Sequence, residues 1–160
     1  MLISNEWLKD YVNVDQSVQA LAERITRTGI EVDDIIDYTK DIKKLVVGHV
    51  LSKTPHPDAD KLNICQVDLG EEEPVQIVCG APNVDEGQHV IVAKVGGRLP
   101  GGIKIKRAKL RGERSEGMIC SLQEIGISSH VTPKNYESGI YVFPEAVKPG
   151  TRSEERRVGK

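Results

Sequence analysis

Cationic side chains are concentrated in one short stretch of the chain, residues 103–111. They are Lys104, Lys106, Arg107, Lys109 and Arg111. Read as a β-strand, the stretch places Ile103 and Ile105 inward, and after a shift of one residue it places Ala108 and Leu110 inward. Such a shift is produced by a β-bulge, which bends a strand. The pattern predicts a bent strand whose outer cations contact a polyanion; a solvated strand face with gatekeeping lysines is the alternative.

A second candidate for chemistry is the segment that contains His56, Asp58 and Asp60. A histidine with a D-x-D pair could begin a metal site, but hard cations need further carboxylates, and the run at residues 71–73 is the only close one. We therefore expect no metal here. The better interpretation is a rigid loop in which prolines fix the backbone, the two aspartates bond to local amides, and Lys61 begins the next strand.

Two glycine-rich segments, residues 80–84 and 96–102, could cradle a phosphate group. Neither contains the G-x-x-x-x-G-K-[ST] pattern, and their prolines remove amides that a phosphate nest would use. A nucleophile is equally unsupported, because Ser115, Cys120 and Ser121 have no recognisable set of spaced Asp and His residues. We expect no catalytic residue and no bound cofactor in this chain.

The cysteines also indicate structure rather than chemistry. Cys65, Cys79 and Cys120 are odd in number and far apart, and each lies in an apolar run. This spacing argues against a disulfide framework and against a zinc site. We expect all three to be small buried hydrophobes.

The composition limits how the chain could hold a polyanion. Its 160 residues carry a net charge of -2 with a pI near 6.1, so a polyanion site must be a local patch. Aromatic residues make up 4% of the chain and none lies in the basic stretch, which disfavours base stacking. No apolar run is long enough to span a bilayer and the N-terminus lacks signal-peptide character, so we expect a cytoplasmic protein that contacts no membrane.

The elements that would position the basic stretch have strand character from about residue 45 onward. Apolar runs bounded by Gly, Pro, Asp or Asn occur at residues 45–51, 62–69, 75–79, 89–95 and 140–143. The Pro-rich residues 53–57 should leave the sheet, since proline has no amide donor. The basic strand should end in a turn at residues 112–117, and Ser121 should open a helical turn. Five to six short strands with one small helix predict a mainly β, Greek-key barrel of the OB-fold type over residues 40–151.

The first 39 residues form a different unit. Ser4 can cap a short helix carrying Trp7, and Asp15 can cap a second helix that Gly29 would stop. The isoleucines at residues 30–36 then suggest a short strand. These elements have more apolar surface than they can cover, so we expect an incomplete α/β domain whose partner segment is missing.

The last residues, 152–160, do not fit the rest of the chain. They have no apolar period, they follow a Pro-Gly break, and their string RSEERRVGK resembles a translated sequencing-library adapter. We expect a non-native tail, and a chain that is the N-terminal fragment of a longer protein.

Several unusual strings occur in a fixed order along the chain. They are HPDADKLNICQVDLG, QIVCGAPNV, GGRLPGGIKIKRAKLRGERSEGMICS and SLQEIG. From about residue 45 to residue 143 the chain resembles the tRNA-binding domain of translation proteins, also called the EMAP-II-like domain. The leading strings MLISNEWLKDYV and LAERITRTGIEVDDI resemble the start of the β subunits of bacterial phenylalanyl-tRNA synthetases, in which such a barrel is inserted into a small N-terminal domain.

The resemblance implies a function for the parent enzyme and a narrower one for this piece. The family's enzyme is an α2β2 heterotetramer that joins phenylalanine to its tRNA (a phenylalanine–tRNA ligase) using ATP and Mg²⁺, which bind outside the residues present here. Its implied partners are tRNA and the α subunit. The tRNA-binding residues carried over are Lys61, Asn83, Lys104, Lys106, Arg107, Lys109, Arg111, Ser115, Gly117 and Met118.

We therefore predict a non-catalytic module that contacts the RNA backbone through phosphates. Ser115 and the amides of its turn would donate to phosphates, whereas Met118 could equally belong to the core. Two alternatives remain open: a stand-alone tRNA-binding protein of the same domain family, and a structural or assembly barrel with no direct RNA contact.

Overall fold

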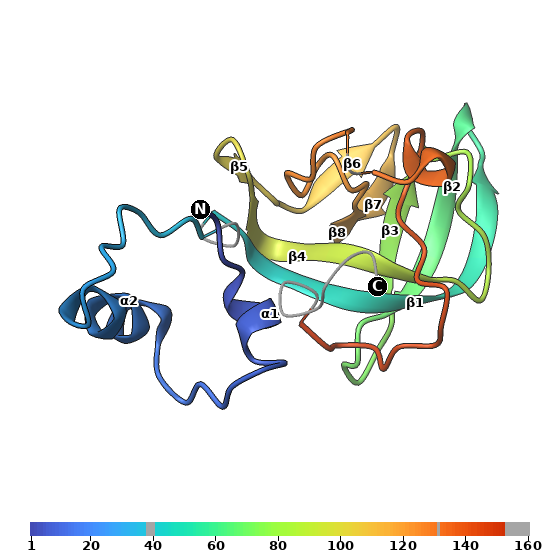
Figure 1. Cartoon of the computed structure of the whole chain (residues 1–160). Coiled ribbons are helices and arrows are strands. Elements are labelled where there is room, and N and C mark those ends of the chain that lie inside the picture. Colours follow the sequence, from blue (N-terminus) through green and yellow to red (C-terminus); the bar gives the residue numbers. More distant parts are fainter. Residues whose placement is uncertain (38–40, 131, 153–160) are drawn as a thin grey trace. The chain divides into compact units, whose positions relative to one another are not determined.

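The computed structural model describes residues 1–37, 41–130 and 132–152, and the chain divides into two compact units. The first is Met1–Asp37 and the second is Tyr38–Lys160. Among the described residues, α-helices occur only in the first unit and strands only in the second (Figure 1). None of the described helices is long and apolar enough to cross a membrane.

Two sequence-predicted boundaries fall largely on residues outside this description. The predicted junction between residues 39 and 40 lies outside the described residues, and so does the predicted tail apart from Arg152.

The first unit contains two capped helices. Helix α1 (Asn5–Leu8) begins at Ser4, whose hydroxyl accepts a hydrogen bond from a first-turn amide, as predicted. Helix α2 (Val18–Arg27) begins at Ser17, whose Oγ accepts from the amide three residues later at 3.2 Å. The prediction that Asp15 caps this helix was wrong. Asp15 is two residues too early to reach the free amides of the first turn.

Helix α2 ends where the sequence predicted, but no strand follows it. Gly29 adopts a φ of +102°, in the left-handed region that stops a helix. Residues 30–37 are irregular, and Ile30 and Ile36 are exposed. The predicted strand is therefore wrong, because these residues make no ladder with any described strand, and a strand requires one.

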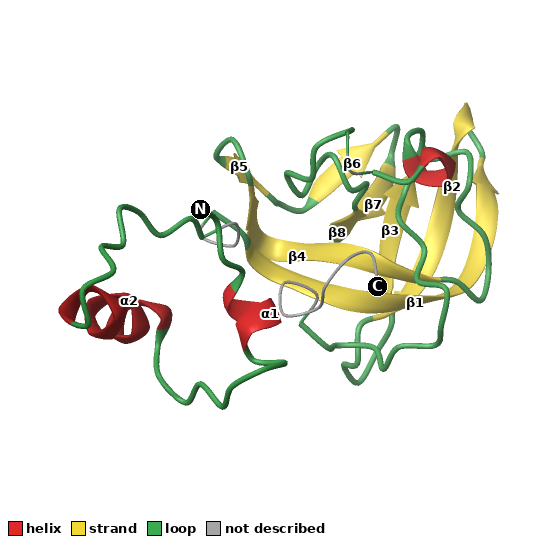
Figure 2. Ribbon diagram, in the orientation of Figure 1, coloured by secondary structure: helices red, strands yellow, loops and turns green. Residues whose placement is uncertain are grey.

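The second unit is built on a curled antiparallel sheet in the order β3-β2-β1-β4, with β8 on the far side of β4 (Figures 1 and 2). Short strands β5, β6 and β7 lie between β4 and β8 in sequence, and the 3₁₀ helix Lys134–Tyr136 follows them. The strands are β1 (Lys43–His56), β2 (Ala59–Asp68), β3 (Val75–Cys79), β4 (His89–Leu99), β5 (Ile103–Lys104), β6 (Ala108–Leu110), β7 (Glu113–Ser115) and β8 (Gly117–Ile119).

The curled sheet closes where β3 meets the residues just before β8. The amide of Val78 donates to Ser115 Oγ at 3.1 Å, and the amide of Glu116 donates to the carbonyl of Gln76 at 2.8 Å. This closure joins the first and last strands of the sheet order. It confirms the predicted mainly β barrel of the OB-fold type with a small N-terminal appendage.

The second unit buries two clusters of apolar side chains, one on each face of β1 and β4, because neighbouring residues such as Val90 and Ile91 belong to different clusters. Val47, Val50, Val67 and Val90 are fully buried, and Leu45 and Ile91 nearly so. The three cysteines are buried as predicted and form no disulfide. Burial raises the pKa of the Cys65 thiol to about 11 and that of Cys120 to about 12, so both remain protonated thiols at neutral pH.

Strand β1 continues farther than the sequence predicted. It runs through Pro55 to His56, although prolines were expected to end it at about residue 52. The reason is that β1 pairs with β4 only over its first half, through His49, whereas residues beyond Ser52 pair only with β2. One edge of β1 is therefore unpaired at Pro55, and a missing amide costs no ladder hydrogen bond there.

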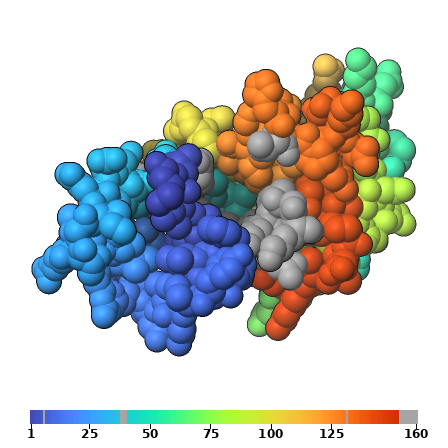
Figure 3. All heavy atoms as spheres, in the orientation of Figure 1, coloured from blue at the N-terminus to red at the C-terminus, as the bar shows by residue number. Residues whose placement is uncertain are grey.

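The segment after the 3₁₀ helix covers one face of the barrel as a continuous band (Figure 3). The predicted last strand, 140–143, is reduced to a single bridge between Val142 and Val90. Farther along, the carbonyl of Thr151 accepts from the amide of Val47 at 2.8 Å. The turn opened by Ser121 has reciprocal capping bonds with Glu124, as a helix start would, but it does not continue as a helix.

Candidate nucleic-acid interface

The basic stretch forms the connection between β4 and β8, which are neighbours in the barrel. In OB-folds this connection and the one between the first two strands bind oligonucleotides. The prediction of one bulged, apolar-backed strand was wrong. The stretch is split into β5 and β6, which pair with different partners, and Ile105 is the only buried residue within it. Ile103 and Leu110 are 53% and 40% exposed.

Strands β6 and β7 form a tight hairpin that presents the basic stretch to solvent. Leu110 pairs with Glu113, and both intervening residues have positive φ, +51° at Arg111 and +91° at Gly112. These angles are typical of a type I′ turn, whose twist matches that of the paired strands. The turn is therefore at residues 111–112, earlier than the predicted turn at 112–117.

All six predicted cations are exposed. Within residues 41–130 and 132–152, only Arg107 among them has an ion pair, with its Nε 3.5 Å from Glu116 Oε1. The other five are Lys61, Lys104, Lys106, Lys109 and Arg111. Since these five make no ion pair with another described residue, their charges are exposed to an approaching anion.

His56 connects the β1–β2 loop to the basic hairpin. Its Nε2 lies 3.0 Å from the carbonyl oxygen of Leu110, and its Nδ1 accepts from the amide of Asp58 at 3.0 Å. Since Nδ1 accepts, the ring proton is on Nε2, which donates to Leu110. The imidazole is 5% exposed, so this link is protected from water. The described residues contain no group of three or more His, Cys, Asp or Glu that could hold a metal ion.

A groove of about 750 Å³ lies beside the hairpin. Its walls come from the loop after β3, from β5 and β6, from β8 and from residues 139–140. Apolar and charged side chains are mixed along it, and the charged ones are Lys104, Lys106 and Glu124. The lining includes Ala81, Pro82, Ile103, Lys104, Lys106, Ala108, Leu110, Ser115, Gly117, Met118 and Ile140.

Asn83 holds two loops together. Its Nδ2 donates to the carbonyl of Ile140 at 2.8 Å, and its Oδ1 accepts from the Ile140 amide at 3.0 Å. The close approach of the Asn83 side chain to the backbone requires glycine at position 139, because a Cβ there would lie 2.2 Å from Asn83 Oδ1. The side chain is therefore used within the barrel.

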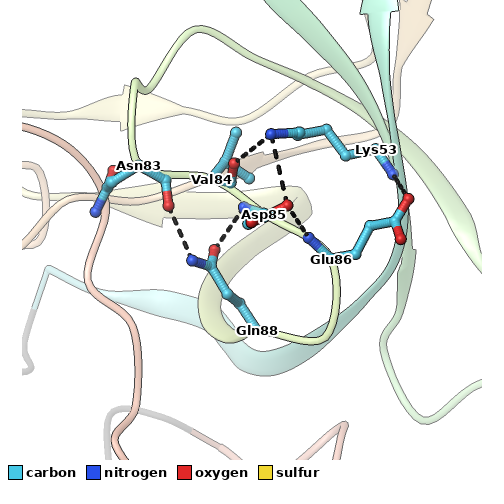
Figure 4. Close-up of polar contacts among 6 residues, drawn as sticks. All are labelled: Lys53, Asn83, Val84, Asp85, Glu86 and Gln88. Atoms are coloured by element: carbon cyan, nitrogen blue, oxygen red, sulfur yellow. Dashed lines mark hydrogen bonds and ion pairs between the residues drawn. The ribbon is translucent and has the colours of Figure 1, made fainter.

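The loop of residues 83–88 is held by its own polar groups and by Lys53 of β1 (Figure 4). Lys53 Nζ donates to the carbonyl of Val84 at 3.1 Å and lies 3.5 Å from Asp85 Oδ1. Gln88 bridges the loop, accepting from the amide of Asp85 and donating to the carbonyl of Asn83. The bond from the Glu86 amide, followed by the charge of Lys53, lowers the pKa of the Asp85 carboxyl.

The three remaining predicted residues lie at the barrel closure. Ser115 is 4% exposed, and its hydroxyl also donates to the carbonyl of Gly117 at 3.0 Å. At Gly117, with φ of +150°, a Cβ would lie 2.9 Å from the carbonyl oxygen of Ala93. Met118 is partly buried against the core. These residues shape the wall of the groove.

The fold thus brings Lys104, Lys106, Ser115, Gly117 and Met118 to one groove, whereas Asn83 is used in holding the loops. Sequence reasoning missed the role of His56. It assigned the surrounding loop to local hydrogen bonds, and nothing in the spacing of the sequence links residue 56 to residue 110.

Comparison with known families matches residues 45–152 to the family described as "Putative tRNA binding domain". The chain is 99% identical over 151 residues to the phenylalanine–tRNA ligase beta subunit of Staphylococcus epidermidis (strain ATCC 12228 / FDA PCI 1200), covering 94% of this chain and 19% of that protein. It is 83% identical, with the same coverage, to the corresponding subunit of Staphylococcus aureus (strain USA300).

Among solved structures, the MetRS related protein from Pyrococcus horikoshii is similar, at 23% identity with a TM-score of 0.48 over 77% of this chain and 98% of that one. The chain spans about a fifth of the length of the curated relatives that it matches (19%). Since the family match covers residues 45–152, well over half of the chain, the barrel and its basic hairpin belong to the family of tRNA-binding domains.

Proposed function

We propose that this chain acts as the tRNA-binding module of a phenylalanyl-tRNA synthetase β subunit, contributing contacts to the attachment of phenylalanine to tRNA. The single observation that carries the proposal is the set of exposed cations on the β4–β8 connection, of which only Arg107 has an ion pair among the described residues, in a domain of the tRNA-binding family. The parent enzyme would work in the cytoplasm with an α subunit, and its ATP and Mg²⁺ would bind outside this chain.

The residues divide into two roles. The six cations would neutralise phosphates of the RNA backbone and so release the counterions bound there. They are Lys61, Lys104, Lys106, Arg107, Lys109 and Arg111. The other four residues would hold the loops and the groove in place, since each is hydrogen-bonded to or packed against other parts of this unit. They are Asn83, Ser115, Gly117 and Met118. Contacts of this kind read the shape and charge of RNA rather than its sequence.

A role in assembly, without RNA contact, is the second candidate. The net charge of -2 favours it, because a barrel that packs against other protein domains needs no positive field. In that case the basic hairpin would be a solvated edge, where lysines prevent aggregation.

The test is binding of transcribed phenylalanine tRNA to the whole chain across a salt series, with a non-cognate tRNA and a DNA duplex beside it. We expect salt-dependent affinity for both tRNAs. Reversing three charges (K106E/R107E/K109E) should weaken binding by about a hundredfold or more and flatten the salt dependence, without unfolding the barrel. Absence of tRNA binding at low salt, or unchanged affinity in the reversed variant, would instead support the assembly role.

A further inference from the structure

Three cations outside the hairpin stand in a row across the barrel. Lys43, the first residue of β1, pairs directly with Arg98 near the end of β4, and Arg98 pairs directly with Lys104 of β5. Directly paired residues of antiparallel strands project from the same face of the sheet, with Cβ atoms about 5 Å apart. The three side chains therefore form a ridge about 10 Å long across three adjacent strands.

This row works against the stability of the sheet. Like charges directly opposite each other on neighbouring strands repel. All three side chains are exposed, and in the described parts of the chain none of them has an ion pair. Asp41, two residues before β1, makes no ion pair with another described residue either. Three like charges that repel one another, with no ion pair to any described residue, fit an external anion.

Two unusual backbone features accompany the row of cations. At Gly97 a Cβ would lie 2.7 Å from the carbonyl oxygen of Lys43, so only glycine lets β1 and β4 approach closely enough to pair Lys43 with Arg98. Lys44 has a φ of +57°, a region that residues with side chains rarely adopt. Its Nζ would lie 3.0 Å from a Cβ at Gly96, two residues before Arg98.

We propose that Lys43, Arg98 and Lys104 form a second phosphate-binding track, which takes a segment of RNA backbone that continues from the groove. Lys104 belongs to both surfaces, so the track and the groove are continuous. An extended ligand is favoured over a single phosphate group, because the row is an open ridge rather than an enclosed pocket. The inference rests on the proposed function and adds Lys43 and Arg98 to its contact residues.

The test uses the whole chain and transcribed phenylalanine tRNA. The double variant K43A/R98A removes one lysine and one arginine from the track. The control R24A/K148A removes the same two residue types from exposed positions on α2 and on the C-terminal segment, with the same change in net charge. Binding is measured at several salt concentrations, together with thermal unfolding of each variant without RNA.

We expect K43A/R98A to bind roughly tenfold more weakly at low salt, and to lower the slope of log affinity against log salt by about 1.5, since each phosphate contact contributes about 0.7–0.9. The control should keep the slope of the unaltered chain. The unfolding midpoint of K43A/R98A should be equal or higher, because repulsion within the row is relieved.

Equal slopes for K43A/R98A and the control would overturn the track while leaving the proposed function intact. A lowered unfolding midpoint would also overturn it, since the row would then stabilise the sheet. If the unaltered chain fails to bind tRNA at the lowest salt, the proposed function and the track both fail.

Discussion

The loop of residues 83–88 and the β6–β7 hairpin both carry charged groups at the surface of the same barrel, yet they use them differently. At the loop, the ammonium of Lys53 on the neighbouring strand β1 is bound to Val84 and Asp85. In the hairpin, Lys109 and Arg111 extend into solvent without an ion pair in the described residues. The surroundings of a cation therefore decide its value for polyanion binding, because a lysine that is partly buried and bound within the protein is less available than an exposed one.

The first prediction concerns the amide that anchors the loop. Asn83→Ala should lower the free energy of unfolding by about 2–3 kcal/mol, because two hydrogen bonds to Ile140 are lost and its backbone groups are left without partners. Urea denaturation measures the change, and Asn135→Ala, at an exposed position of the 3₁₀ helix, is the matched control. The tRNA affinity of the folded protein should stay within about twofold of the unaltered chain, as expected for a side chain that makes no phosphate contact. A loss of affinity with unchanged stability would instead make Asn83 a direct tRNA contact.

The second prediction makes the same substitution, lysine to methionine, at the cation that binds the loop and at a cation of the hairpin. Lys53→Met should cost about 1 kcal/mol of unfolding free energy, since a partly exposed ammonium loses its bond to the Val84 carbonyl, and should leave tRNA affinity unchanged. Lys109→Met should leave stability unchanged and reduce the salt slope of tRNA binding by about 1. Chemical denaturation and a salt titration on both variants check this reciprocal pattern. If both variants behave alike, the distinction between the two regions is wrong.

The barrel could be predicted from the sequence, because the apolar run of each strand and the turn residues that bound it are local signals. The bounds 75–79 for β3 were predicted correctly, and so were the buried cysteines. The prediction of an apolar face on the basic stretch was wrong, because it rested on alternation alone. Whether Ile103, Ala108 and Leu110 are buried depends on which strands pair with β5 and β6, and all three are exposed. Strand pairing depends on residues far apart in the sequence, so the alternation within residues 103–111 cannot predict it.

The candidate site shows the same limit. The spacing of the cations predicted their exposure, because charged side chains on a hairpin have no buried alternative. The contacts made by Asn83 and Ser115 could not be predicted. Each joins segments 37 or 57 residues apart, and only the closed barrel brings them together. Capping was predicted correctly at Ser4 and wrongly at Asp15, since Ser17 competes for the same amides and is better placed.

The last prediction tests separately the two hydrogen bonds of His56, to the Leu110 carbonyl and from the Asp58 amide. The change in tRNA affinity that we expect is the smallest of the series. His56→Asn keeps an acceptor for the Asp58 amide, as in an Asx turn, but cannot reach Leu110. His56→Gln places an amide donor near the position of Nε2, so it can keep the bond to Leu110 while losing the acceptor. If the imidazole positions the basic hairpin, the Asn variant should bind tRNA about three- to fivefold more weakly, corresponding to about 1 kcal/mol of ordering free energy. The Gln variant should bind like the unaltered chain, even where both variants lose similar stability in urea. Equal affinities for Asn and Gln would mean that the hairpin holds its own conformation through its type I′ turn, and that its cations need no support from the β1–β2 loop.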